Sequence, residues 1–299
     1  MATARQRRLA AVAAALCPAL PRLPPCKSSA AAALSPGDAQ PPAAVLSPAE
    51  LAAWERDGVV IVKRAVPRAV TAGIRRDIRA LLELGPEGTR EGWWRRPEGV
   101  GGRGGLELYQ TQAQWEARAA PRVYGAFAQI WGRRDLHCSI APCHFREPLH
   151  AAHPGFGGGL RLHWDRSREL WRHPGPLRAG IQAVLHLADT PAHGGGWKGV
   201  PGFHRLFEDP QFAERLQDWQ PEQADGSSGR TKSDRSYVEL PEARAAGLVE
   251  RVYAGEDGDM LVWNALVPHG TEDNSSSQPR QAQYLNVSKS EPRSISDAI

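Results

Sequence analysis

Hydrophobic and polar positions divide the chain into a helical first part and a strand-rich second part. The Ser-Pro-Ala-Glu run at 47–50 has the form of a capping box with proline at the first helical position, and it predicts a helix start. An apolar stripe continues to Trp54, and Gly58 ends the helix. The apolar run Val59–Val62 then predicts a short buried strand.

Two further helical stretches follow this strand. The first is predicted from near Arg68 to Leu84 and ends at Gly85. The second is predicted over Thr111–Trp131, where Pro121 would kink or interrupt it because proline cannot donate the helical hydrogen bond. The residues between these helices form a glycine-rich loop.

From about residue 135 onward, short apolar segments alternate with glycine, proline and asparagine. The predicted strands are Leu136–Ile140, Leu160–Asp165, Ala179–Leu187, Trp197–Val200, Leu248–Tyr253, Asp259–Trp263 and Arg280–Val287. Many short strands with such punctuation favour a sandwich, jelly roll or barrel. The polar stretch 206–246 is interpreted as an inserted lid or surface excursion. We therefore predict a mainly β fold with flanking helices.

The net charge of +4 comes from the first 44 residues, a leader rich in alanine, proline and arginine. Removing its five basic residues and one acidic residue from the totals of 37 and 33 leaves 32 of each sign in residues 45–299, which we predict to be one domain. Overall charge thus gives no argument for nucleic-acid binding. The leader composition predicts an organelle transit peptide, for a mitochondrion or plastid. A secretory signal or a disordered tail are the alternatives, and without import we expect a cytoplasmic protein.

The overall composition excludes two further classes of protein. No stretch approaches the roughly 20 apolar residues of a membrane-spanning helix. Four cysteines in 299 residues are too few for a disulfide scaffold, and Cys138 and Cys143 lack the spacing of a zinc site. The oligomeric state is left open by the sequence.

A candidate metal site is formed by His163, Asp165 and His269. Residues two apart on a strand project from the same face, so His163 and Asp165 can reach one point. His269 follows a predicted strand in a Pro-His-Gly turn, where it can supply a third ligand. Two imidazoles and one carboxylate suit Fe(II), and Arg280, eleven residues on, can bind a carboxylate in bidentate fashion.

The segments Gln182–Thr190 and Gly194–Arg205, the latter with a Val-Pro-Gly-Phe-His run, make the chain recognisable. Together with the Arg-Asp-Gly-Val-Val run at 56–60, they resemble the phytanoyl-CoA dioxygenase family of Fe(II)/2-oxoglutarate oxygenases. The resemblance spans about Leu51 to Val287. It implies a double-stranded β-helix, or jelly roll, covered on one side by the N-terminal helices.

The resemblance also implies roles for particular residues. His163, Asp165 and His269 match the iron ligands, and Arg280 matches the residue that pairs with the distal carboxylate of 2-oxoglutarate. Gln182 falls on the strand that lines the cosubstrate pocket. His204 matches an element that is mostly structural in the family, and the remaining histidines are predicted to be surface or satisfied core residues: His137, His144, His150, His153, His173, His186 and His193.

The function that this resemblance implies is hydroxylation of a small organic substrate, such as an acyl-CoA, by Fe(II), 2-oxoglutarate and O2, with release of succinate and CO2. Because halogenating relatives lack the carboxylate ligand, Asp165 favours hydroxylation. Two departures from the family pattern are Lys198, near the Gly-Gly element, and Ala282, where some relatives have a hydroxyl. The alternatives are a non-catalytic jelly-roll binding module and a cupin-like metalloenzyme without 2-oxoglutarate.

The ten tryptophans are expected to pack the core, with Trp164 also a candidate border of the substrate site.

Overall fold

The computed structural model of the protein describes residues 44–84, 104–150, 157–165, 180–218, 232–233 and 240–289. All of the predicted leader except Ala44 lies outside these ranges, and so does most of the centre of the 206–246 segment.

The described residues contain seven helices, five of which begin with a proline or a capping box. They are α2 (Pro48–Asp57), α3 (Arg68–Leu82), α4 (Gln112–Arg118) and α5 (Pro121–Trp131), followed later in the chain by the 3-10 helix η2 (Phe203–Glu208), α6 (Pro210–Asp218) and α8 (Pro241–Ala245). The Ser47 hydroxyl accepts a hydrogen bond from the Glu50 backbone N–H, which completes the predicted capping box of α2. Pro121 separates α4 from α5, so the predicted helix over 111–131 is two helices.

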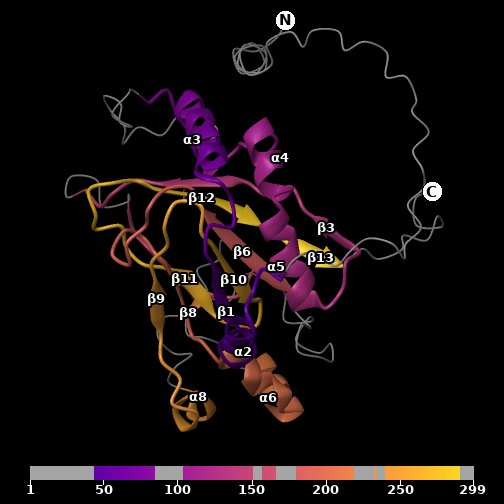
Figure 1. Ribbon diagram of the computed structural model, residues 1–299. Helices are drawn as coiled ribbons and strands as arrows, with labels where there is room; N and C mark the ends of the chain where they lie inside the picture. Colours follow the sequence, from indigo (N-terminus) through magenta and orange to yellow (C-terminus); the bar gives the residue numbers. More distant parts are fainter. Residues whose placement is uncertain are drawn as a thin grey trace, which may run out of the picture. The chain divides into compact units, whose positions relative to one another are not determined.

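The strands form two antiparallel sheets that face each other, and a small two-stranded ribbon (Figure 1). The six-stranded sheet has the order β1 (Val59–Val62), β10 (Met260–Asn264), β6 (Ile181–His186), β12 (Arg280–Leu285), β4 (Cys143–Arg146) and β2 (Gly105–Leu106). The five-stranded sheet has the order β8 (Lys232–Ser233), β5 (Leu160–His163), β11 (His269–Thr271), β7 (Trp197–Gly199) and β9 (Arg251–Tyr253), and the ribbon pairs β13 (Val287–Lys289) with β3 (Leu136–Cys138). This architecture confirms the predicted mainly β fold.

Successive side chains along the strands of the six-stranded sheet point to opposite faces, and each face is covered by its own apolar layer. In β10, Met260 and Val262 belong to the core cluster shared with the helices, whereas Leu261 and Trp263 belong to a second cluster that also holds Trp197 of the other sheet. The first cluster includes side chains of α3, α4 and α5, which lie along this sheet in Figure 1. The functional candidates therefore lie in the second layer, between the two sheets.

The structure differs from the predicted strands at several places. The short strands β2 and β8 were not predicted, and β5 ends at His163, two residues before the predicted end at Asp165. Strand β4, between Pro142 and Pro148, was not predicted. His269 does not lie in a turn, because it begins β11 and pairs with both β5 and β7. The last predicted strand is divided into β12 and β13.

The described ends of the 206–246 segment are packed against the body of the protein. Phe207, Phe212 and Leu216 are buried in one cluster with Phe203 and Trp164. The four aromatic rings of this cluster meet edge to face in four pairs, including Phe207 and Phe212 at 5.2 Å between centroids. These described ends pack into a core of their own beside the strand that bears His163. They do not extend over the surface as predicted.

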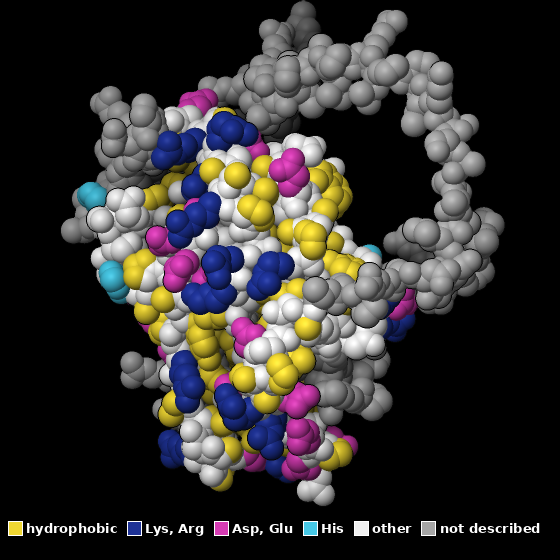
Figure 2. Space-filling model, viewed as in Figure 1, with side chains coloured by type: hydrophobic (Ala, Val, Ile, Leu, Met, Phe, Trp, Pro, Cys, Tyr) yellow, Lys and Arg dark blue, Asp and Glu magenta, His cyan; other side chains and the backbone are white. Residues whose placement is uncertain are grey.

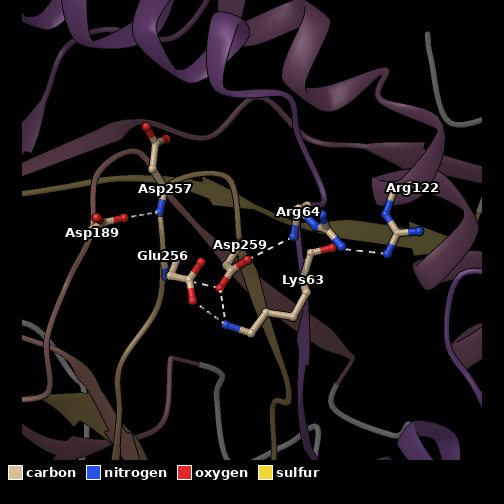
Figure 3. Close-up of polar contacts among 7 residues, drawn as sticks. All are labelled: Lys63, Arg64, Arg122, Asp189, Glu256, Asp257 and Asp259. Atoms are coloured by element: carbon tan, nitrogen blue, oxygen red, sulfur yellow. Dashed lines mark hydrogen bonds and ion pairs between the residues drawn. The ribbon is translucent and has the colours of Figure 1, made fainter.

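A polar network connects the turn after β1 with the turn before β10 (Figure 3). The buried carboxylate of Asp259 accepts hydrogen bonds from the Lys63 ammonium at 2.8 Å and from the backbone N–H groups of Arg64 and Glu256. The Arg122 guanidinium of α5 donates to the Lys63 carbonyl. A buried charge needs such partners, so this network fixes the turn after β1 to the turn before β10, and Arg122 connects helix α5 to it.

The face drawn in Figure 2 carries lysine and arginine side chains with acidic and apolar ones among them. This mixture agrees with the balanced charge of residues 45–299. Within the described ranges, no helix combines the length and the apolar character that crossing a bilayer requires.

Candidate metal centre

Three side chains predicted as metal ligands come together between β5 and β11. His163 is the last residue of β5, Asp165 follows it by two, and His269 lies opposite His163 in the antiparallel pairing. The Nε2 atoms of both histidines lie 3.4 Å from an oxygen of Asp165, and one ligand atom from each residue lies within 4.8 Å of the others. Two imidazoles and one carboxylate at this separation can hold one metal ion on a single face.

The backbone fixes which imidazole nitrogen faces the site. His163 Nδ1 lies 2.8 Å from the Arg161 carbonyl oxygen, and His269 Nδ1 lies 3.1 Å from the Val267 carbonyl oxygen. A carbonyl only accepts, so each Nδ1 carries the hydrogen and donates it. Each Nε2 therefore faces Asp165, and it is the nitrogen that would bind a metal held between the three side chains.

Burial and neighbouring groups shift the pKa values of two of the three ligands, Asp165 and His269. Burial by itself raises the pKa of a carboxyl group, but the hydrogen bonds and charges of His163 and His269 hold the pKa of Asp165 well below its usual range. Burial lowers the pKa of His269 despite the nearby carboxylate. Both shifts favour the forms that bind a metal, an ionised carboxylate and a neutral imidazole.

Gln182 of β6 contacts the metal centre directly. Its Nε2 donates to Oδ2 of Asp165 at 2.9 Å, from the opposite sheet. Its Oε1 is buried and has no hydrogen-bond partner among the described residues. The amide thus orients the carboxylate and leaves one acceptor facing the interior.

Two tryptophans pack against His269 and keep water away from it. The Trp197 ring stacks on the imidazole with 6.1 Å between centroids, and the Trp263 ring lies at 4.9 Å. Both tryptophans are almost fully buried. They give the metal centre an apolar wall on the side of β7 and β10.

Arg280, the first residue of β12, is a buried cation without a partner in the described protein. Only 2% of the residue is exposed, and Nε, Nη1 and Nη2 all lack a hydrogen-bond partner there. A guanidinium buried in this state fits a carboxylate ligand, because five N–H groups otherwise lose their hydration without compensation. A Cβ on Gly195 would lie 3.3 Å from Arg280 Cδ, and the φ of +79° at Gly195 also favours glycine.

Arg146 is a second buried cation of this interior and was missed by sequence reasoning. It lies opposite Arg280 in the register of β4 and β12, and its Nη1 donates to the Gly158 carbonyl and to Thr271 Oγ1. Burial, and then the charge of Arg280, lower its pKa to about 10. The signal that could have found it is the alternation in β4, whose inward positions are polar.

Two other positions that the sequence singled out are Trp164 and Lys198. The Trp164 ring is buried in the aromatic cluster with Phe203 and Phe207, as expected of a core tryptophan, and its bordering of the substrate stays a prediction. The Lys198 ammonium pairs with Glu250 at 3.5 Å and Glu272 at 3.7 Å.

His204 and Gly58 are in contact, as the structural role predicted for His204 requires. The His204 Nε2 lies 3.2 Å from the Glu55 carbonyl oxygen. A Cβ on Gly58 would lie 2.6 Å from the His204 ring, and Gly58 has a φ of +67°. The ring and the glycine together fix the end of α2.

Comparison with known sequences identifies the family. The sequence profile of the family described as phytanoyl-CoA dioxygenase matches residues 54–282. The chain belongs to the phytanoyl-CoA dioxygenase family. It is therefore a 2-oxoglutarate-dependent dioxygenase, with iron and 2-oxoglutarate as its cofactor and cosubstrate.

Two curated relatives are similar over much of the chain. Ava biosynthesis cluster protein O of Aspergillus versicolor is 24% identical over 253 residues, which are 78% of this chain and 74% of that protein. A Dictyostelium discoideum protein named as a phytanoyl-CoA dioxygenase is 24% identical over 198 residues, which are 57% of this chain. The match spans about half of the Dictyostelium protein, at 52%.

Solved structures share the fold at low sequence identity. The epimerase SnoN in complex with Fe3+, alpha ketoglutarate and nogalamycin RO has a TM-score of 0.53 and 15% identity, covering 81% of this chain and 82% of that one. EctD from S. alaskensis with 2-oxoglutarate and 5-hydroxyectoine has a TM-score of 0.54 and 18% identity, covering 86% and 81%. These similarities establish the jelly-roll fold.

Proposed function

We propose that this dioxygenase hydroxylates a small organic substrate and releases succinate and CO2. The observation that carries the proposal is the convergence of His163, Asp165 and His269 in an interior that also holds the unpartnered guanidinium of Arg280. Bound iron and 2-oxoglutarate would supply the oxidising chemistry, in which O2 is reduced, 2-oxoglutarate loses CO2 and one oxygen atom enters the substrate.

The residues of the chain would bind, orient and exclude water. His163, Asp165 and His269 would hold the iron on one face and leave its other positions to ligands. Arg280 would bind the distal carboxylate of 2-oxoglutarate. Gln182 would keep the Asp165 carboxylate in place through its 2.9 Å hydrogen bond.

The substrate class is proposed from chemistry and from the complexes of similar folds. SnoN was crystallised with nogalamycin RO, and EctD with 5-hydroxyectoine, both small organic molecules. For this chain we propose a small molecule of comparable kind, with an acyl-CoA as the option that the family description suggests. The presence of the Asp165 carboxylate favours hydroxylation over halogenation, because it occupies the position that a halide would take.

An anaerobic titration of the full-length protein tests the proposal. Fe(II) is added with and without 2-oxoglutarate, and absorbance is followed at the visible charge-transfer band of the chelated cosubstrate. The band should require both components and disappear in His163→Ala. In Arg280→Ala, 2-oxoglutarate should bind roughly 30-fold more weakly or worse, because truncating one partner of a buried charge pair costs about 2–5 kcal/mol.

Two exposed residues provide matched controls. His137→Ala removes a surface imidazole and Arg205→Ala removes a surface guanidinium, and both should leave the band unchanged. Absence of a band in folded, unmodified protein would refute the 2-oxoglutarate site and favour a binding module. Turnover of 2-oxoglutarate that yields succinate but no oxygenated product with any substrate tested would refute the hydroxylation.

A further inference from the structure

His186 is a buried histidine whose ring nitrogens have no partner among the described residues. It is the last residue of β6, it has no exposed surface, and neither Nδ1 nor Nε2 makes a hydrogen bond there. The sequence predicted a surface or satisfied core histidine, and the structure shows that this is wrong. A neutral imidazole that loses its hydration without a partner is costly, so the position calls for an explanation.

The strand register directs this imidazole into the interior that contains Arg280. Gln182, which contacts Asp165, lies four residues before His186 on the same strand, and side chains at even spacings share a face. His186 lies opposite Ala282 of β12, and Arg280 is two residues from Ala282 on the same face. His186 and Arg280 are therefore diagonal neighbours, roughly 7–8 Å apart, a distance that long side chains span.

Gly255 holds the ring in this place. A Cβ on Gly255 would overlap the His186 ring, so the imidazole lies directly against the backbone between β9 and β10. Ala282 is the smallest side chain with a Cβ and leaves room between His186 and Arg280. Burial, and then the charge of Arg280, lower the pKa of His186 to about 4, so the ring is neutral near pH 7 and carries one N–H donor.

We propose that His186 is a second ligand of the anion bound by Arg280, donating its N–H to the distal carboxylate of 2-oxoglutarate. The inference rests on the proposed function. Arg280 supplies the charge, and His186 supplies a neutral donor from the neighbouring strand. A carboxylate held from two strands has a defined orientation as well as a counter-charge.

Binding of two metal chelators separates this role from a structural one. 2-Oxoglutarate has a distal carboxylate and oxalate has none, although both chelate iron. Calorimetric affinities of the Fe(II)-loaded, oxygen-free protein are compared for His186→Phe, which keeps a ring without a donor, and His186→Gln, which keeps an amide donor. His186→Leu repeats the loss of the donor with a smaller side chain.

The expected result is a selective loss. His186→Phe and His186→Leu should bind 2-oxoglutarate about 10- to 100-fold more weakly, the usual effect of losing a hydrogen bond to a charged group. Oxalate should bind within about 2-fold of the unmodified protein, and His186→Gln should retain most of the affinity for 2-oxoglutarate. His204→Phe removes a partly buried imidazole at the end of α2 and should change neither affinity.

Each contrary result has a separate meaning. Unchanged 2-oxoglutarate affinity in both donorless variants, or equal losses for 2-oxoglutarate and oxalate, would overturn the role of His186 and leave the proposed function standing. Failure of the unmodified protein to bind 2-oxoglutarate would refute the proposed function, and this inference with it.

Discussion

Trp164 links all three candidate metal ligands, and replacing it tests whether the core supports the metal centre. It stands between His163 and Asp165, and its Nε1 donates at 2.9 Å to the carbonyl of Leu266, three residues before His269. Its ring is buried in the aromatic cluster of η2 and α6. One side chain thus holds the strand with two ligands against the segment that leads to the third.

The substitution Trp164→Phe removes this hydrogen bond and keeps an aromatic ring. The buried Leu266 carbonyl loses its side-chain donor, which costs about 1–3 kcal/mol, and the smaller ring adds a cavity cost of roughly 1 kcal/mol. The free energy of unfolding of the metal-free protein should fall by about 2–4 kcal/mol. Because the ligands also lose part of their support, Fe(II) affinity should fall by about tenfold, at the low end of the effect of supporting residues around metals.

Trp131→Phe is the matched control for this experiment. Trp131 of α5 donates its Nε1 to the Val287 carbonyl at 3.0 Å, in the core cluster on the helix side of the six-stranded sheet. Urea unfolding of both metal-free variants measures stability, and competition with a chromophoric chelator under anaerobic conditions measures Fe(II) affinity. The control should lose stability and keep its Fe(II) affinity. Equal Fe(II) affinities in the two variants would show that Trp164 contributes packing alone.

Three further predictions concern the acid stability and the interior of the protein. Burial raises the pKa of Asp259, but Lys63 and two backbone N–H groups lower it below its ordinary 3.8, so its contribution to stability is present above pH 3.8 and is lost as pH falls through the lower folded value. Lys63→Met should move this loss to higher pH in urea midpoints measured across the acid range, and an unchanged profile would contradict the role of the pair. Gln182→Leu removes the donor to Asp165 and should weaken Fe(II) binding by about tenfold, which chelator competition checks. Gly195→Ala should cost about 1–2 kcal/mol of unfolding free energy because of its φ of +79°, and should weaken 2-oxoglutarate more than Fe(II) because the methyl group would press on Arg280; equal affinities for 2-oxoglutarate would argue against that contact.

The parts of the fold that sequence predicted well are those with local signals. The capping box at Ser47 and Glu50 marks the start of α2, and Pro121 marks the start of α5. The strands β6 and β10 are rich in apolar residues because both of their faces are buried, one against helices and one against the other sheet. Such strands can be predicted without knowing which strands lie beside them.

Strand β4 was missed because its buried face is polar. Cys143 and Phe145 face the helices, whereas His144 and Arg146 lie opposite Ala282 and Arg280 of β12. The alternation of β4 extends over only four residues, and it would have placed the two polar side chains in solvent rather than in the interior. The interior between the sheets holds cations and imidazoles. The rule that buried positions are apolar therefore fails at the positions where ligands are expected to bind.

The residues of the candidate site also fall into two groups, those that local sequence predicts and those that depend on how the strands pair. His163 and Asp165 are two residues apart, so strand geometry predicted that they lie close together, although β5 ends at His163 and Asp165 follows in a bend. The hydrogen bond between Gln182 and Asp165 joins the two sheets, and the diagonal placement of His186 and Arg280 joins two neighbouring strands. Both depend on the strand register. A shift of one residue would turn Gln182 and His186 toward the helices, because side chains alternate between the faces. The ligand set can therefore be predicted from spacing, whereas the residues that orient it become visible only when the pairing of the strands is known.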